Sequence, residues 1–344
     1  MNPQIPFKPA PLHWGGHLQS IIPSLYSVAP QPAWQRSRWE WNDAIEATIV
    51  PQDGDFVDID SLPQGDVSAP TLVLFHGLEG SSNSHYSRSI AAFFHAQGWR
   101  VLAPHFRGCS GVPNRLLRAY HSGDSAEIAR MLLRASRLYP QSPLHALGVS
   151  LGGNALLCYL AEHGQEQWQG APVPHKAMAV CAPLDLGRCG EAITTGFANV
   201  YTMMFMKTLL QKTREKKPKF PEAVEWDTVL KCKNLAEFDE VFTGPVHGYA
   251  GVLDYYARAS AKEKLPHIKT PTLMINARND PFVPNDILDA IEKRQLCSPS
   301  TTLERPDYGG HVGFASGTAK HLLRGELQWL PRRAWAFFNE TAAN

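Results

Sequence analysis

The sequence has little of what marks a membrane-spanning or secreted protein. No apolar run in its 344 residues approaches the roughly 18 residues that a transmembrane helix needs. The N-terminus, Met1-Asn2-Pro3-Gln4, lacks the basic region and apolar core of a signal peptide. The formal net charge of +1 gives no electrostatic basis for binding nucleic acid. We therefore expect a soluble, cytoplasmic protein without a nucleic-acid partner.

Cysteine is scarce and irregularly spaced. No two cysteines form a C-x-x-C pair, and several lie in apolar runs such as 179–182. This spacing argues against both a disulfide framework and a zinc site, and favours buried free thiols in a reducing compartment. We predict no metal. The six cysteines are Cys109, Cys158, Cys181, Cys189, Cys232 and Cys297.

Short apolar runs alternate with helical segments through much of the chain. Residues 71–75 are a continuous apolar run bounded by Pro70 and Gly77, which is typical of a strand buried on both faces. Such alternation predicts an α/β fold with a mostly parallel sheet flanked by helices. The strands are expected at 71–75, 100–104, 144–149, 176–182, 272–276 and 301–304, and the helices at 86–97, 123–138, 154–162, 285–294 and 328–340.

The alternation stops between residues 184 and 264, which contain no buried-strand pattern. We predict that this stretch is a helical cap inserted into a core formed by residues 1–183 and 265–344. Residues 1–35 are rich in proline and aromatic residues, so we expect them to form an arm packed on the core.

A nucleophile motif follows the predicted strand at 144–149. Gly148-Val149-Ser150-Leu151-Gly152 has the form G-x-S-x-G, and it lies between a strand and a helix, the context in which a serine is raised above the sheet. The glycines permit the close approach that such a turn needs. We predict that Ser150 is the nucleophile. The Leu151 N–H is then expected to face the oxyanion that develops when the serine attacks an acyl carbon. The alternative is a chance occurrence of the pentapeptide.

A second oxyanion donor is expected after the first buried strand. His76-Gly77-Leu78-Glu79-Gly80 directly follows residues 71–75. Enzymes with a G-x-S-x-G nucleophile between a strand and a helix take the second N–H that binds the oxyanion from this loop. We assign this role to Leu78. An ordinary glycine-rich turn is the alternative.

The acid and the base are expected after the nucleophile, in that order. Asp280 follows the strand predicted at 272–276, and His311 lies in the glycine-flanked loop after the last strand. We predict that His311 is the general base and that Asp280 orients it. The nearest competitors are Asp286 and His321, which are predicted to lie on helices.

A longer pattern carries a resemblance to a known family. It comprises Gly16-His17-Leu18-Gln19-Ser20, the segment Pro104-His105-Phe106-Arg107-Gly108-Cys109-Ser110-Gly111, Asn114-Arg115, Tyr120-His121-Ser122-Gly123-Asp124 and Asn279-Asp280-Pro281-Phe282. Over nearly the whole chain it resembles the AB-hydrolase 4 family, which contains bacterial YheT-like and plant EMB8-like proteins. The resemblance implies the α/β-hydrolase fold and carboxylic-ester hydrolysis, and it carries the triad onto Ser150, Asp280 and His311.

The same resemblance includes eukaryotic medium-chain ester synthases/esterases and glycerolipid lipases. Many of these have an N-terminal membrane anchor, and because this sequence lacks one we do not carry membrane residence over.

Two segments have open interpretations. In residues 104–124, Arg107, Arg115 and His121 could bind a polar head group, or Arg107 and Asp124 could form an internal ion pair. In the predicted cap, Met203, Met204 and Phe205 are candidates to line an acyl pocket, and the alternative is plain cap core. The basic run Lys212, Arg214, Lys216, Lys217 and Lys219 is either a solvated face or a peripheral contact with anionic lipid.

The leading functional hypothesis is a serine carboxylesterase acting on a small-molecule acyl ester of short to medium chain length. An alcohol acyltransferase or a glycerolipid lipase would use the same triad, and a thioesterase or C–C bond hydrolase also stays open, because the triad does not fix the leaving group. A non-catalytic binding protein on a hydrolase scaffold is the alternative from another class. We expect no cofactor.

Overall fold

The computed structural model describes residues 6–42, 49–317 and 323–340. Its centre is an eight-stranded sheet in the order β1-β2-β4-β3-β5-β6-β7-β8. Only β2 runs against its neighbours; all other pairs from β4 to β8 are parallel. The strands are β1 (Gln35–Glu40), β2 (Phe56–Leu62), β3 (Thr71–Phe75), β4 (Arg100–Pro104), β5 (Leu144–Val149), β6 (Lys176–Val180), β7 (Thr272–Ile275) and β8 (Thr301–Glu304).

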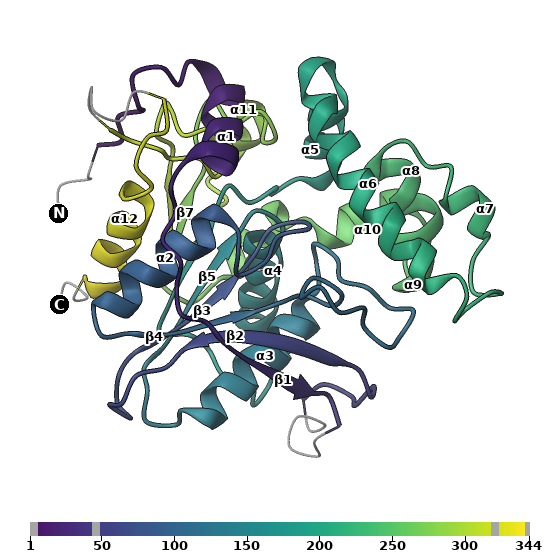
Figure 1. Cartoon of the computed structure of the whole chain (residues 1–344), viewed down its shortest axis with the longest axis horizontal. Coiled ribbons are helices and arrows are strands. Elements are labelled where there is room, and N and C mark those ends of the chain that lie inside the picture. Colours follow the sequence, from purple (N-terminus) through teal and green to yellow (C-terminus); the bar gives the residue numbers. More distant parts are fainter. Residues whose placement is uncertain (1–5, 43–48, 318–322, 341–344) are drawn as a thin grey trace.

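Helices cover both faces of the sheet (Figure 1). Outside the segment between β6 and β7 they are α1 (Gly15–Tyr26), α2 (His85–Ala96), α3 (Ser125–Leu138), α4 (Leu151–Gly164), α11 (Asn285–Lys293) and α12 (Trp329–Asn339). The predicted α/β fold with a mostly parallel sheet is confirmed.

Alternate residues of each central strand enter different cores, which explains the unbroken apolar runs. On β3, Val73 and Phe75 belong to the core that also contains side chains of α3, α4 and α11, whereas Leu72 and Leu74 belong to the core that contains side chains of α2 and α12. All four side chains are at most 1% exposed. Apolar residues are therefore favoured on both sides of these strands.

Between β6 and β7, residues 181–271 form no strand. We call this stretch the helical insertion; it projects to the right of the sheet in Figure 1. It has its own small core around Met206, Trp226 and Phe242. Its elements are α5 (Leu186–Thr194), η1 (Gly196–Ala198), α6 (Asn199–Lys216), α7 (Trp226–Val229), α8 (Leu235–Phe238), the π-helix η2 (Asp239–Thr243), α9 (Gly244–Val246), α10 (Val252–Ala259) and η3 (Lys262–His267).

The N-terminal segment lies against the C-terminal part of the core. The Phe7 ring contacts the rings of Phe314 and Trp329, and the Ala10 N–H donates to the Ala315 carbonyl at 3.0 Å. Of the predicted arm, residues 1–5 lie outside the described part. No helix in the described ranges has the length and apolar composition to cross a membrane.

Candidate active site

Ser150 occupies the sharp turn between β5 and α4. Its backbone has φ 52° and ψ −121°, a conformation that a residue with a side chain rarely adopts and that surrounding contacts must hold. The Ser150 N–H donates to the Val180 carbonyl of β6 at 2.8 Å. A Cβ on Gly148 would lie 2.5 Å from the Gly152 carbonyl oxygen, and one on Gly152 would lie 2.4 Å from that of His76. Both glycines are therefore required by close backbone approach.

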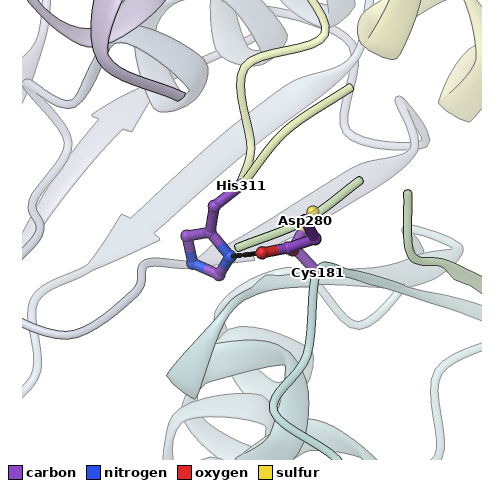
Figure 2. Close-up of side chains that lie close together, drawn as sticks. All are labelled: Cys181, Asp280 and His311. Atoms are coloured by element: carbon purple, nitrogen blue, oxygen red, sulfur yellow. Dashed lines mark hydrogen bonds and ion pairs between the residues drawn. The ribbon is translucent and has the colours of Figure 1, made fainter. Parts of the chain in front are cut away.

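His311 and Asp280 complete a hydrogen-bonded chain with this serine. His311 Nε2 lies 3.0 Å from Ser150 Oγ, and His311 Nδ1 lies 2.9 Å from Asp280 Oδ2 and 3.2 Å from Oδ1. Figure 2 shows the imidazole of His311 directed at the Asp280 carboxylate. The Asp280 side chain is 0% exposed, and its Oδ1 also accepts the Phe282 N–H at 2.8 Å. These bonds fix both the carboxylate and the ring.

Asp286, the alternative candidate for the acid, does not pair with His311. Asp286 lies on α11, is mostly exposed and pairs with Arg188 at 2.8 Å. His321, the alternative histidine, lies outside the described residues.

Backbone amides on two sides of Ser150 are suited to bind an oxyanion. Leu151 is the first residue of α4, so its N–H has no partner within the helix. In the loop after β3, the Gly77 and Glu79 N–H groups donate to the hydroxyls of Tyr86 and Tyr120. Among the described residues, the Leu78 N–H between them has no acceptor, which leaves it available to a ligand.

A cavity of about 450 Å³ opens above Ser150, between the sheet and the helical insertion. It is lined by Leu78, Leu151 and His311 near the serine and by Phe205, Leu209 and Phe242 from the insertion. This volume lies in the range of small-molecule sites, and mostly apolar walls are typical of them.

Comparisons with known proteins agree with this geometry. The sequence profile of the family described as alpha/beta hydrolase fold matches residues 70–318. This chain belongs to the α/β-hydrolase family. It is 36% identical over 323 residues to the Escherichia coli K12 protein YheT, which carries the provisional name of an esterase, with 92% of this chain and 88% of that protein covered. This relative agrees with the YheT-like resemblance of the sequence.

A more distant relative is a mouse phospholipase of the same fold, ABHD3. It is 29% identical over 253 residues, which is 72% of this chain and 59% of the phospholipase, so this chain spans less than two thirds of that protein. Among solved structures, an esterase of Pyrococcus furiosus has a TM-score of 0.54 at 18% identity, with 91% of this chain and 95% of that chain covered. This last likeness concerns the fold alone.

Within this hydrolase fold, two of the three residues expected to line an acyl pocket lie elsewhere. Phe205 does line the cavity. Met203 and Met204, on the outer side of α6, are 57% and 59% exposed and are not among the lining residues. The assignment of Met203 and Met204 was wrong because α6 carries apolar residues on its solvent-exposed face as well as on the face that packs inward.

Arg107 is buried, but not through the expected ion pair with Asp124. Its guanidinium is 0% exposed and binds Asp55 at 2.9 Å and Glu127 at 2.9 Å, with Asp53 as a third partner at 2.7 Å. Asp124 instead binds Arg118 at 2.6 Å. The predicted pair was therefore wrong in its partner.

The other head-group candidates of the 104–124 segment are also engaged. Arg115 pairs with Glu40 at the surface. His121 is buried against the rings of His247 and Tyr255, and this burial lowers its pKa to about 3. Arg107 and His121 are among the residues that line the cavity, but the partners described here for their side chains are other groups of the protein.

The basic run on α6 partly points inward. Lys212 donates to Glu79 at 2.7 Å, and the buried Lys216 donates to Asn114 Oδ1 at 2.7 Å. Burial lowers the pKa of Lys216 to about 8. The run is therefore not a uniformly solvated basic face.

Three residues that belong to patterns noted in the sequence have contacts at the site that the sequence did not predict, and two of them hold the Leu78 loop. The Tyr120 hydroxyl accepts the Glu79 N–H and donates to Glu79 Oε1 at 2.7 Å. Lys212 reaches the same oxygen from α6. Phe282, part of the Asn279-Asp280-Pro281-Phe282 pattern, stacks on the His311 ring with centroids 4.0 Å apart. Its place two residues after Asp280 is the one signal that could have found it.

The thiol of Cys181 lies beside the acid and the base, as Figure 2 shows. One ligand atom each from Cys181, Asp280 and His311 lie within 4.8 Å of one another. However, His311 Nδ1 is engaged by Asp280, the sulfur accepts the Val312 N–H, and burial raises the pKa of the Cys181 thiol. A metal ion binds the thiolate form of cysteine, so these three residues fit an Asp280–His311 hydrogen bond with a neighbouring thiol better than a metal site. The absence of a metal stays a prediction.

Proposed function

We propose that this protein is a serine carboxylesterase that hydrolyses short- to medium-chain acyl esters through an acyl-enzyme. The observation that carries the proposal is the continuous chain of hydrogen bonds from Asp280 through His311 to Ser150, at 2.9 Å and 3.0 Å. It ends at a serine hydroxyl facing an apolar cavity.

The mechanism follows from these contacts. His311 Nε2 takes the proton of Ser150 Oγ as the oxygen attacks the acyl carbon, and the N–H groups of Leu78 and Leu151 bind the oxyanion. His311 then gives the proton to the leaving alcohol. Water, activated by the same nitrogen, releases the acid. Asp280 holds the proton on Nδ1 so that Nε2 can accept, and it stabilises the imidazolium.

The size and chemistry of the cavity support the substrate class. About 450 Å³ is enough for a small ester and not for a long diacyl lipid held entirely inside. Apolar side chains of α6, α8 and η2 face the cavity, among them Leu209, Phe238 and Phe242. We propose that residues 184–264, the part of the helical insertion delimited in the sequence analysis, are a cap that holds the acyl chain.

A glycerolipid lipase or an alcohol acyltransferase would share the acyl-enzyme. The similarity to a relative named as a phospholipase supports the lipase as an alternative. Adding a short alcohol to the assay and analysing the products separates ester synthesis from hydrolysis. For location we retain the cytoplasm as a proposal, since all six cysteines are unpaired, as expected in a reducing compartment.

The test is hydrolysis of p-nitrophenyl esters from acetyl to palmitoyl by the wild type and by Ser150→Ala. We expect turnover with a maximum at short to medium chains and a loss of several orders of magnitude in the variant. Equal rates for the two proteins would refute the proposal, and a maximum at palmitoyl would refute the chain length.

A further inference from the structure

Helix α1 contacts both loops that carry the proposed base and acid, although it lies about 260 to 290 residues away in sequence. Ser20 Oγ accepts the backbone N–H of His311 itself at 2.7 Å. Gln19 Oε1 accepts the Gly309 N–H at 2.7 Å and the Asn279 Nδ2–H at 2.9 Å. Two neighbouring side chains of α1 thus hold the residues beside His311 and Asp280.

The network is closed by its remaining atoms. Asn279 Oδ1 accepts the Gly310 N–H at 3.0 Å. Gln19 Nε2 donates to the His13 carbonyl at 2.8 Å. The Ser20 hydroxyl donates to the carbonyl of Gly16 at 2.7 Å, which leaves its lone pairs for His311. Gln19 and Ser20 are 2% and 7% exposed, so these bonds are shielded from water.

The histidine loop has a backbone that requires such support. Gly310 has φ 59°, Val312 has φ 60° and Phe314 has φ 40°. A left-handed conformation is unfavourable for residues with side chains, above all a β-branched one, and it persists only where the surroundings fix it. On the opposite side of the loop, Cys181 Sγ accepts the Val312 N–H.

The approach of α1 to the acid loop is equally close. A Cβ on Gly16 would lie 1.8 Å from the carbonyl oxygen of Asn279. The pattern Gly16-His17-Leu18-Gln19-Ser20 therefore has a physical explanation: a glycine for contact, followed by an amide and a hydroxyl that accept the N–H groups of the loops.

We propose that Gln19 and Ser20 are positioning residues that hold the His311 ring within reach of both Ser150 and Asp280. The proposal rests on the function proposed above. A misplacement of about 1 Å at a reacting group can cost on the order of 10²-fold in rate. Loss of one of these bonds therefore lowers kcat by roughly ten- to a hundred-fold and leaves KM unchanged, because neither side chain lines the cavity.

The first variant is Ser20→Ala, which removes the acceptor of the His311 N–H together with the hydroxyl's own bond to the Gly16 carbonyl. Its matched control is Ser24→Ala on the same helix, because the Ser24 hydroxyl is exposed and donates to the Ile21 carbonyl within the helix. kcat is measured per active site, titrated with a fluorophosphonate, so that unfolded protein does not count. Ser20→Ala is expected to lose about ten-fold or more, and Ser24→Ala nothing. A wild-type kcat per site in Ser20→Ala overturns the proposal.

A second readout does not depend on turnover. The proton of His311 Nδ1, held by Asp280, is observed by proton NMR, and its resonance shifts or broadens in Ser20→Ala and in Gln19→Leu but not in Ser24→Ala. If wild type hydrolyses no ester, the proposed function fails and this resonance alone decides the inference. An unmoved resonance in Ser20→Ala overturns it. In an active protein, a moved resonance with unchanged kcat per site also overturns it.

Discussion

Replacing Asp280 by asparagine changes the hydrogen bonding of the proposed triad while leaving its shape in place. The carboxylate accepts from His311 Nδ1 through both oxygens, at 2.9 and 3.2 Å, and Oδ1 also accepts the Phe282 N–H. Because Oδ1 is held by that amide, the asparagine NH₂ group would take the place of Oδ2. It would then donate to Nδ1, which forces the ring proton onto Nε2.

An Nε2–H cannot accept the proton of Ser150, so the reaction loses its general base. The same exchange in a serine protease triad lowers kcat about 10⁴-fold, which corresponds to about 5 kcal/mol of transition-state stabilisation. We expect a loss between 10³- and 10⁴-fold here. Asp280 has a side chain that is 0% exposed, so solvent cannot supply a substitute acceptor.

The assay compares kcat for one p-nitrophenyl ester in wild type, Asp280→Asn and Asp286→Asn. Asp286 is the matched control, because it lies six residues away, is mostly exposed and pairs with the exposed Arg188 side chain. Circular dichroism establishes that each variant is folded. A loss of less than ten-fold in Asp280→Asn, or an equal loss in Asp286→Asn, would refute the reasoning.

Two further predictions concern stability. Arg107→Met removes the cation that the buried carboxylates of Asp55 and Glu127 share, and leaves Glu127 with the more distant Arg130 at 3.6 Å. The free energy of unfolding in urea should therefore fall by about 3–5 kcal/mol. Arg115→Met at the surface should leave the free energy of unfolding unchanged, and equal effects of the two substitutions would contradict this account. Burial raises the pKa of Asp239 from its usual 3.8 to about 7, so the folded state binds a proton that the unfolded state has lost, and stability should decline as the pH rises from about 4 to 7. Asp239→Asn should flatten this part of the Tm–pH curve, and an unchanged slope would contradict it.

The parts that sequence predicted well depend on local pattern. A strand such as β3 is apolar on both sides because both of its faces are covered, and this shows in the four consecutive apolar residues 72–75. The serine, acid and base were predicted because each follows a strand end in the fixed order of the fold. Their hydrogen-bonding geometry agrees with that prediction, and their catalytic role remains proposed.

The parts that sequence missed depend on contacts between distant segments. Arg107 binds Asp53 and Asp55, more than 50 residues upstream, whereas the expected partner Asp124 was near in sequence. Gln19 lies 290 residues from Gly309. Neither pairing has a local signature in the sequence. The order of strands in the sheet brings these segments together, and the sequence of either segment alone does not specify that order.

The most direct test of the central claim is covalent labelling with a fluorophosphonate, followed by mass mapping of the modified peptide. Such a probe reacts with a serine that an adjacent base activates. We predict that wild type is labelled at Ser150, that Ser150→Ala is not labelled, and that His311→Ala is labelled more slowly by orders of magnitude. Failure of folded wild type to react, or labelling at another residue, would contradict the account.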